Sequence, residues 1–347
     1  MILPWRERLA RMIQKIPRTP KPCLAMLMPS FMLALALSAC APIPFGTPRA
    51  TPGHPIITSG IFTLPGNVRL PYRLYPAQGQ TRAVVLALHG YDDSRDGWAM
   101  LATVLNRHGI TLVAPDQSGF GATPDRGHWP GTNALVTQAG EMATQLRAQY
   151  PNTRLVLMGE SMGGAIGLLL AASPHPPPVN AYVLSAPAVW GGAAMSPVDR
   201  IAIGLGARIA PGARLTGQSV HIRASDNIAA LIAFGEDPLT IHAPRLDDLA
   251  GLIRLMGKAQ AACAKLRQPS LILYGGHDEL VPAAAMRACW RAIPAGAPVM
   301  LAFYQPDYHL IERDIERATP DADIIGYILG TNIPSAAPSA ATVFLAG

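Results

Sequence analysis

Ser161 lies between two glycines in the stretch LMGESMGGAIGL, which spans Leu157 to Leu168. A serine hydroxyl is a weak nucleophile by itself, so covalent catalysis needs a base to remove its proton and an acid to orient that base. A serine among glycines is also compatible with a close-packed seam that has no chemical role. A catalytic role for Ser161 therefore requires a histidine and a carboxylate elsewhere in the chain.

Both groups follow apolar runs in the C-terminal part of the chain. Asp278 follows SLILY in the stretch SLILYGGHDELVP, and His309 follows VMLAFY in the stretch VMLAFYQPDYHLIERD. His277 and Asp307 are close competitors, although His277 stands where the acid is expected. We predict that Asp278 orients His309 and that His309 is the general base for Ser161.

Two backbone amides are the predicted donors to an oxyanion. Met162 follows Ser161 where a helix is expected to begin, and the free amides at a helix N-terminus bind negative charge. Tyr91 follows His89 and Gly90 in the stretch LALHGYDDS, directly after another apolar run. We therefore predict that the amides of Tyr91 and Met162 form the oxyanion hole.

Short apolar runs alternate with helical patterns, which is typical of a mostly parallel sheet buried on both faces. The predicted fold class is thus α/β, with a core at residues 59–186 and 266–332 and a long insertion at residues 187–265. Residues 333–347 are rich in small side chains and are expected to form a peripheral C-terminal tail. We expect a hairpin over Ile61–Leu64 and Val68–Tyr75, strands at Ala83–Leu88, Ile110–Ala114, Arg154–Met158, Ala181–Ser185, Ser270–Tyr274 and Val299–Tyr304, and helices at Gly97–Arg107, Asn133–Tyr150, Gly163–Ala172 and Ala283–Ala292.

The net positive charge of the chain comes almost entirely from its N-terminal segment. Six of the 28 basic residues and one of the 22 acidic residues precede residue 40, which leaves 22 basic and 21 acidic residues beyond it. The formal charge of +6 therefore predicts no nucleic-acid partner for the folded part.

The same segment has the layout of a secretory signal, because its basic residues precede the apolar run Cys23–Leu37. Its end, LSAC, resembles the lipobox of bacterial lipoproteins, in which the peptide is cut before a diacylated cysteine. This resemblance implies a signal peptide over residues 1–39, lipidation of Cys40 and, because Ala41 follows, the outer membrane of a Gram-negative cell envelope. Residues 40–58 are rich in proline and predict an extended tether. An ordinary signal peptide or an N-terminal membrane helix is the alternative.

Seven motifs between Ala83 and Arg313 resemble, in order, those of the lysophospholipase and monoacylglycerol lipase group of serine hydrolases, also called the serine aminopeptidase S33 family. They are ALHGYDDS, APDQSGFGATPDRGHWPG, GESMGGAI, LSAPAV, EDPLT, LYGGHDELVP and YHLIERD. The resemblance implies the α/β-hydrolase fold, a triad of Ser161, Asp278 and His309, and a helical cap over residues 187–265. Ser118 departs from the family, which usually has arginine at that position.

We expect a carboxylic ester hydrolase that cleaves acyl lipids, such as monoacylglycerols or lysophospholipids, through an acyl-enzyme. The motifs imply no cofactor and no metal ion. One alternative is an aminopeptidase that binds the substrate amine through Glu236 and Asp237. A second is a surface lipoprotein that uses a hydrolase fold for binding only.

Two cysteines remain if Cys23 leaves with the signal peptide and Cys40 carries lipid. In an oxidising compartment, Cys263 and Cys289 are the candidates for a disulfide. Two buried free thiols are the alternative, because cysteine packs well among alanines.

Overall fold

The computed structural model describes residues 58–191, 195, 197–214 and 222–347. These residues all belong to one folded unit, Pro48–Gly347. The predicted signal peptide, the lipidation site Cys40 and the tether up to residue 57 lie outside the described residues.

An eight-stranded sheet forms the centre of this unit, with the strand order β1-β2-β4-β3-β5-β6-β7-β8. β1 pairs antiparallel with β2, and β2 with β4, whereas all other neighbours are parallel. This arrangement confirms the predicted fold class. The strands are β1 (Thr58–Leu64), β2 (Val68–Tyr75), β3 (Ala83–Leu88), β4 (Ile110–Pro115), β5 (Arg154–Glu160), β6 (Ala181–Ser185), β7 (Ser270–Gly275) and β8 (Val299–Tyr304).

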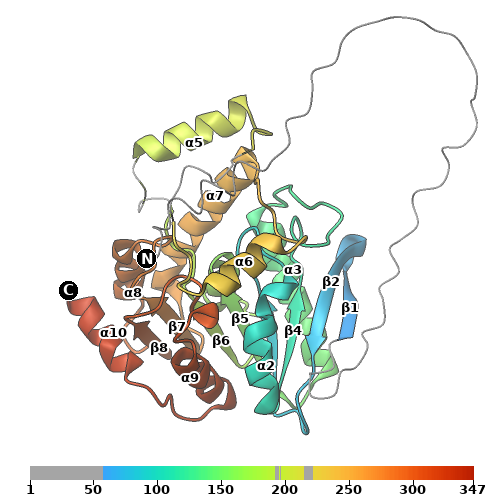
Figure 1. Ribbon diagram of the computed structural model, residues 1–347, viewed down its shortest axis with the longest axis vertical. Coiled ribbons are helices and arrows are strands. Elements are labelled where there is room, and N and C mark those ends of the chain that lie inside the picture. Colours follow the sequence, from blue (N-terminus) through green and yellow to red (C-terminus); the bar gives the residue numbers. More distant parts are fainter. Residues whose placement is uncertain (1–57, 192–194, 196, 215–221) are drawn as a thin grey trace, which may run out of the picture. The chain divides into compact units, whose positions relative to one another are not determined.

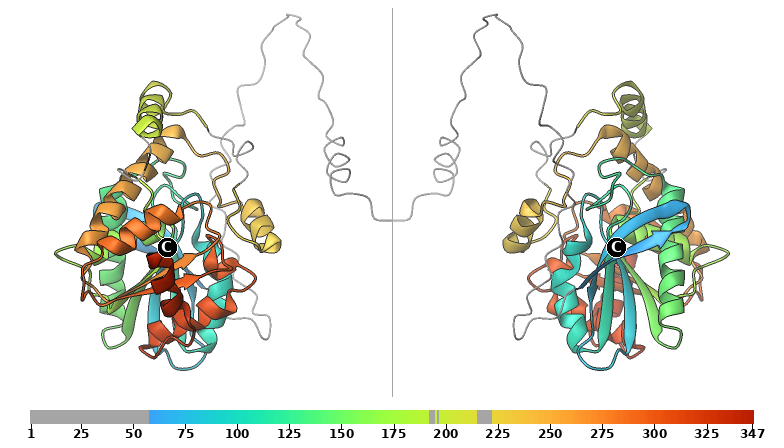
Figure 2. Two further views of the ribbon diagram at one scale, coloured as in Figure 1. Left: turned by 90° about the vertical axis from the view of Figure 1, so that its left-hand side faces the viewer. Right: turned by 90° about the vertical axis from the view of Figure 1, so that its right-hand side faces the viewer.

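Helices cover both faces of the sheet because its central strands are apolar on both faces (Figure 2). In β3, Leu86 and Leu88 pack with the helices of one face, and Val85 and Ala87 pack with those of the other. The first face carries α3 (Thr132–Gln149), α4 (Met162–Ala171) and α8 (Ala283–Ala292), and the second carries α2 (Ala99–Arg107) and α9 (Ala318–Leu329).

The stretch between β6 and β7 holds α5 (Pro197–Ile209), α6 (Ile228–Glu236) and α7 (Leu246–Ala262). α7 packs against α4, and α5 packs against α7 rather than against the sheet (Figure 1). Within the part of the chain that the structure describes, no helix has both the length and the apolar character needed to cross a membrane.

The structure differs from the sequence-based expectation at the C-terminus. Within the expected tail, α10 (Ala337–Ala346) packs against β8 and α8. Phe344 stacks on Phe303 with ring centroids 4.6 Å apart and also contacts Trp290 and Tyr274. The sequence does not predict this helix because most of its residues are small, and its aromatic contacts all come from Phe344.

Candidate active site

Ser161 occupies a strained turn between β5 and α4. Its backbone has φ 53° and ψ −110°, a conformation that L-residues rarely adopt. Glycines make the turn possible: a Cβ on Gly159 would lie 2.2 Å from the carbonyl oxygen of Gly163, and a Cβ on Gly163 would lie 2.0 Å from that of Leu88. The turn is the strand-to-helix geometry that exposes a nucleophile at the carboxyl edge of a parallel sheet.

Asp278 and His309 meet at the same edge, after β7 and β8. Nδ1 of His309 lies 2.8 Å from Oδ2 of Asp278, and the two side chains are 3% and 0% exposed. The other carboxylate oxygen accepts hydrogen bonds from the amides of Leu280 and Val281, at 2.8 and 2.9 Å. The structure thus brings together the predicted acid and the predicted base.

The imidazole of His309 has one nitrogen left for chemistry. Within the described residues, its Nε2 is buried and has no hydrogen-bond partner. Burial alone would lower the pKa of His309, but the charge and hydrogen bond of Asp278 outweigh it, with help from Glu160 and Glu312, so that the pKa lies above its usual value. A base of this kind accepts a proton readily from a hydroxyl group.

The two competitors have other roles in the structure. His277 is exposed, and its Nδ1 lies 3.2 Å from the carbonyl oxygen of Pro306. Asp307 is buried, and Oδ1 of its carboxyl group has no partner among the described residues. Burial and neighbouring carboxylates raise the pKa of Asp307 to about 7. Asp278, not Asp307, is therefore the carboxylate bonded to His309.

The predicted oxyanion donors belong to two segments that adjoin Ser161. Met162 is the first residue of α4, where backbone amides have no acceptor within the helix. The loop that carries Tyr91 approaches closely, since a Cβ on Gly90 would lie 3.5 Å from Cβ of Ser161. The ring of Tyr91 packs edge-on against Phe120, with centroids 5.6 Å apart.

His89 holds this oxyanion loop in place. Its Nδ1 lies 2.8 Å from the carbonyl oxygen of Gly90, and its Nε2 accepts a hydrogen bond from the amide of Gln117 at 3.1 Å. Burial lowers the pKa of His89, so the ring stays neutral and satisfies both contacts.

Sequence reasoning missed a cluster of buried charges that includes Glu160, the residue before Ser161. The guanidinium of Arg313 pairs with Asp93, and its Nη2 lies 3.1 Å from Oε1 of Glu160. Glu312 is also buried, and its burial, together with the nearby charge of Glu160, raises its pKa to about 8. The only available signal was the presence of charged residues inside the motifs GESMGG and YHLIERD.

The inserted segment is hydrogen-bonded to two loops that carry predicted site residues, at the two ends of α6. Before α6, the carbonyl oxygen of Ala224 accepts the amide of Leu310 at 2.9 Å. After α6, the carboxylate of Asp237 accepts the hydroxyl of Ser94 at 3.0 Å, and the amide of Ile241 donates to the carbonyl of Asp92 at 2.9 Å. The insertion is therefore attached to the loops that carry His309 and the predicted oxyanion donor Tyr91.

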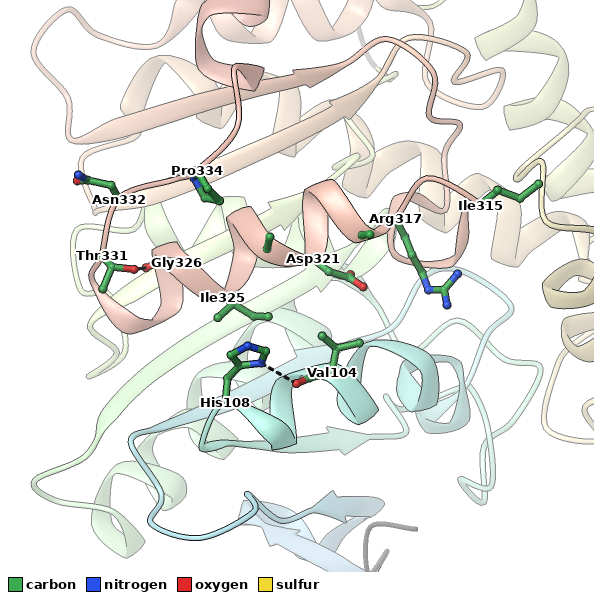
Figure 3. Close-up of a pocket in the computed structure, with 12 residues that line it drawn as sticks. Val104, His108, Ile315, Arg317, Asp321, Ile325, Gly326, Thr331, Asn332 and Pro334 are labelled. Atoms are coloured by element: carbon green, nitrogen blue, oxygen red, sulfur yellow. Dashed lines mark hydrogen bonds between the residues drawn. The ribbon is translucent and has the colours of Figure 1, made fainter. Parts of the chain in front are cut away.

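A pocket of about 500 Å³ lies elsewhere, between α2 and α9. Figure 3 shows Ile325 of α9 opposite Val104 and His108 at the end of α2. Asp321 also lines it, and burial raises the pKa of this carboxyl group to about 7. None of the residues predicted from the sequence to act in catalysis lines this pocket.

Ser161, His309 and Asp278, with the predicted amide donors, are a set of groups suited to acyl transfer, and Nε2 of His309 is not hydrogen-bonded to Ser161 in this structure. Among the residues that the structure describes, no group of three or more His, Cys, Asp or Glu side chains is placed to hold a metal ion.

A family model described as "Serine aminopeptidase, S33" matches residues 79–316. The chain is 27% identical over 269 residues to a monoacylglycerol lipase of Mycolicibacterium smegmatis, covering 76% of this chain and 94% of that protein. It is 24% identical over 250 residues to a monoglyceride lipase of Rattus norvegicus, covering 71% and 82%.

Solved structures show the same fold. The monoacylglycerol lipase of Paleococcus ferrophilus superposes with a TM-score of 0.64 at 20% identity, covering 75% of this chain and 98% of that chain. A soluble variant of monoglyceride lipase from Saccharomyces cerevisiae, in complex with a substrate analog, gives a TM-score of 0.66 at 18% identity, covering 83% and 98%.

Proposed function

Because the chain belongs to the serine aminopeptidase S33 family and is a carboxylic ester hydrolase, we propose that it hydrolyses acyl-lipid esters through an acyl-enzyme on Ser161. The observation that carries this proposal is the hydrogen bond between His309 and Asp278 at the sheet edge where Ser161 forms its strained turn. Each of these groups has a defined task in ester cleavage.

His309 removes the proton of the Ser161 hydroxyl through Nε2 as the oxygen attacks the ester carbonyl. Asp278 fixes the imidazole with Nε2 free and stabilises its charged form. The amides of Tyr91 and Met162 hold the developing oxyanion. The alcohol leaves with the proton from His309, and water activated by the same residue then releases the fatty acid and restores Ser161.

Monoacylglycerols are the proposed substrate class, with lysophospholipids as the second. This proposal is supported by the relatives and structural neighbours of the chain, which are monoacylglycerol or monoglyceride lipases from four organisms. A monoacylglycerol and a lysophospholipid present the same acyl ester and differ in the head group.

The aminopeptidase alternative has less support in this chain. It requires a free carboxylate for the substrate amine, and Glu236 and Asp237 were the candidates. Asp237 already accepts the hydroxyl of Ser94 and the amide of Leu239, at 3.0 and 2.8 Å, and Glu236 is exposed at the end of α6. Neither is therefore a free carboxylate in an enclosed site.

Lipidation of Cys40 is proposed from the sequence alone. A diacylated N-terminus would hold the folded unit near the membrane in which its acyl-lipid substrates reside. Residues 40–58 would then act as the tether, apart from Thr58, which the structure places in β1.

The test compares the wild-type protein with Ser161→Ala. The wild type should react with a fluorophosphonate and hydrolyse p-nitrophenyl butyrate and a monoacylglycerol, and the variant should fold but do neither. A panel with a lysophospholipid and an amino acid p-nitroanilide separates the candidate substrates. Preferential cleavage of the anilide, or normal labelling of the variant, would contradict the proposal.

A further inference from the structure

We propose that Arg313 is a positioning residue for this reaction, because its buried guanidinium joins the three loops that carry the catalytic groups. The inference rests on the proposed function and concerns the positions of the three loops relative to one another. The oxyanion loop is residues 89–94, the nucleophile turn is residues 160–162 and the histidine loop is residues 305–314.

The side chain of Arg313, in the histidine loop, contacts a residue in each of the other two loops. Its Nη2 pairs with Oδ2 of Asp93 in the oxyanion loop, and it lies 3.1 and 3.3 Å from the two carboxylate oxygens of Glu160. The side chains of Arg313, Asp93 and Glu160 are 7%, 4% and 2% exposed, respectively. A single buried cation therefore contacts two carboxylates that belong to different loops.

Each partner is close in sequence to a residue with a proposed catalytic role. Asp93 is two residues after Tyr91, and Glu160 directly precedes Ser161. Arg313 itself closes the histidine loop, since its amide donates to the carbonyl of Leu310 at 2.8 Å. A shift of any one loop would change the position of its catalytic group relative to the other two.

Two glycines show how closely the cluster is packed beneath the site. A Cβ on Gly97 would lie 2.6 Å from Nη2 of Arg313 and 2.6 Å from Oδ2 of Asp93. A Cβ on Gly90 would lie 3.2 Å from Oε1 of Glu160. Gly97 is thus the residue whose missing side chain leaves room for the ion pair.

Both carboxylates contact one nitrogen of the guanidinium, Nη2 of Arg313. The planar guanidinium holds the two N–H groups of this nitrogen in fixed directions, whereas the ammonium of lysine is a compact charge on a flexible chain. Loss of the cation would leave two buried carboxylates close together without compensation, which forces protonation or movement of the loops. A small displacement of a catalytic group has a large effect on the rate, because the reacting atoms must be aligned.

The experiment compares Arg313→Met, Arg313→Lys and Gly97→Ala with the wild type, and uses Arg147→Met as the control. Arg147 also joins several segments, since it donates to the carbonyl of Thr153 at 2.8 Å and to the side chain of Asn180 at 2.7 Å. These contacts precede β5 and β6, at the opposite edge of the sheet. The measurements are kcat and KM for p-nitrophenyl butyrate, the rate of fluorophosphonate labelling of Ser161, and thermal unfolding.

We expect Arg313→Met to lower kcat about 100-fold, the size of effect that misplaced groups produce, and to slow labelling in parallel. KM should change by no more than about twofold, because uniform substrate binding is untouched. Arg313→Lys should recover about tenfold of the lost rate, since charge returns without the planar geometry. Gly97→Ala should lower kcat about tenfold although it alters no charged group. Arg147→Met should lower the unfolding temperature and leave kcat unchanged.

A folded Arg313→Met protein with the kcat of the wild type would overturn the inference, as would an equal loss of kcat in Arg147→Met. If Arg313→Met does not fold, Gly97→Ala decides the matter: an unchanged kcat overturns the inference and a reduced kcat supports it. Failure of the wild type itself to be labelled would instead overturn the proposed function.

Discussion

Nδ1 of His309 donates a hydrogen bond across 2.8 Å to Oδ2 of Asp278, whose other oxygen accepts two backbone amides. The carboxylate is thereby fixed by its own loop before it contacts the imidazole. Since Asp278 is held in this way, the orientation of His309 depends on the loop after β7 as much as on its own loop.

Asp278→Asn should lower kcat by about 10³- to 10⁴-fold, because an amide stabilises the wrong tautomer of the imidazole and no longer balances its charge. Asp307→Asn is the matched control, since Asp307 is a buried carboxyl group two residues from His309 whose Oδ1 has no hydrogen-bond partner among the described residues. Steady-state kinetics with one ester substrate compares them. An equal loss of kcat in both variants would contradict the assignment of Asp278 as the acid.

The pH dependence of kcat/KM should show an acidic limb above pH 6.5. The reaction needs neutral His309, so activity rises as the pH rises through its pKa. Burial lowers this pKa, but Asp278, Glu160 and Glu312 together raise it above its usual value. In Asp278→Asn the limb of the residual activity should move to lower pH, because the largest of the raising effects is gone. A wild-type midpoint below 6.5 would contradict a raised pKa of His309.

Cys40→Ser should block acylation and leave the precursor uncleaved if Cys40 is the lipidated residue. Wild-type protein expressed in a Gram-negative host should partition into the outer-membrane fraction and carry acyl chains in intact-mass analysis. Ala41→Asp is the matched variant, since it keeps the cysteine and is expected to keep the protein at the inner membrane. Cleavage at another bond in the wild type would refute this prediction.

The sheet could be predicted from the sequence, and Ser161, Asp278 and His309 could be selected as candidates, because each carries a local signal. Val84 to Leu88 form an uninterrupted apolar run, which is what a strand buried on both faces requires. Ser161 stands among the glycines that its turn needs, and Asp278 and His309 follow such runs. Their positions at one edge then follow from the parallel direction of the strands.

The charge cluster could not be predicted in the same way. Asp93, Glu160 and Arg313 are separated by up to 220 residues, and a charged residue in a sequence is by default a solvated one. Only the folded backbone shows that the three side chains share one buried site. The helix α10 was missed for a related reason, since its contacts depend on where Phe344 lies and not on any periodic pattern.

The structure joins Cys263 and Cys289 by a disulfide, and this bond provides the last prediction. Cys263 lies at the end of α7 in η5 (Cys263–Lys265), and Cys289 lies in α8, so the loop between them contains β7 and Asp278. Closing a loop with a sequence separation of 26 should stabilise the protein by about 3.5 kcal/mol in the chain-entropy model.

The double variant Cys263→Ala/Cys289→Ala should therefore unfold several degrees below the wild type, while kcat at 25 °C is retained because His309 and Asp278 keep their hydrogen bond. Thiol titration of the unfolded, unreduced mature protein gives an independent measurement, in which neither cysteine should react. Wild-type protein heated with a reductant serves as the control, since it should match the double variant in unfolding temperature. Two reactive thiols in the unreduced protein, or equal unfolding temperatures with and without the reductant, would show that the bond does not form or does not stabilise the fold.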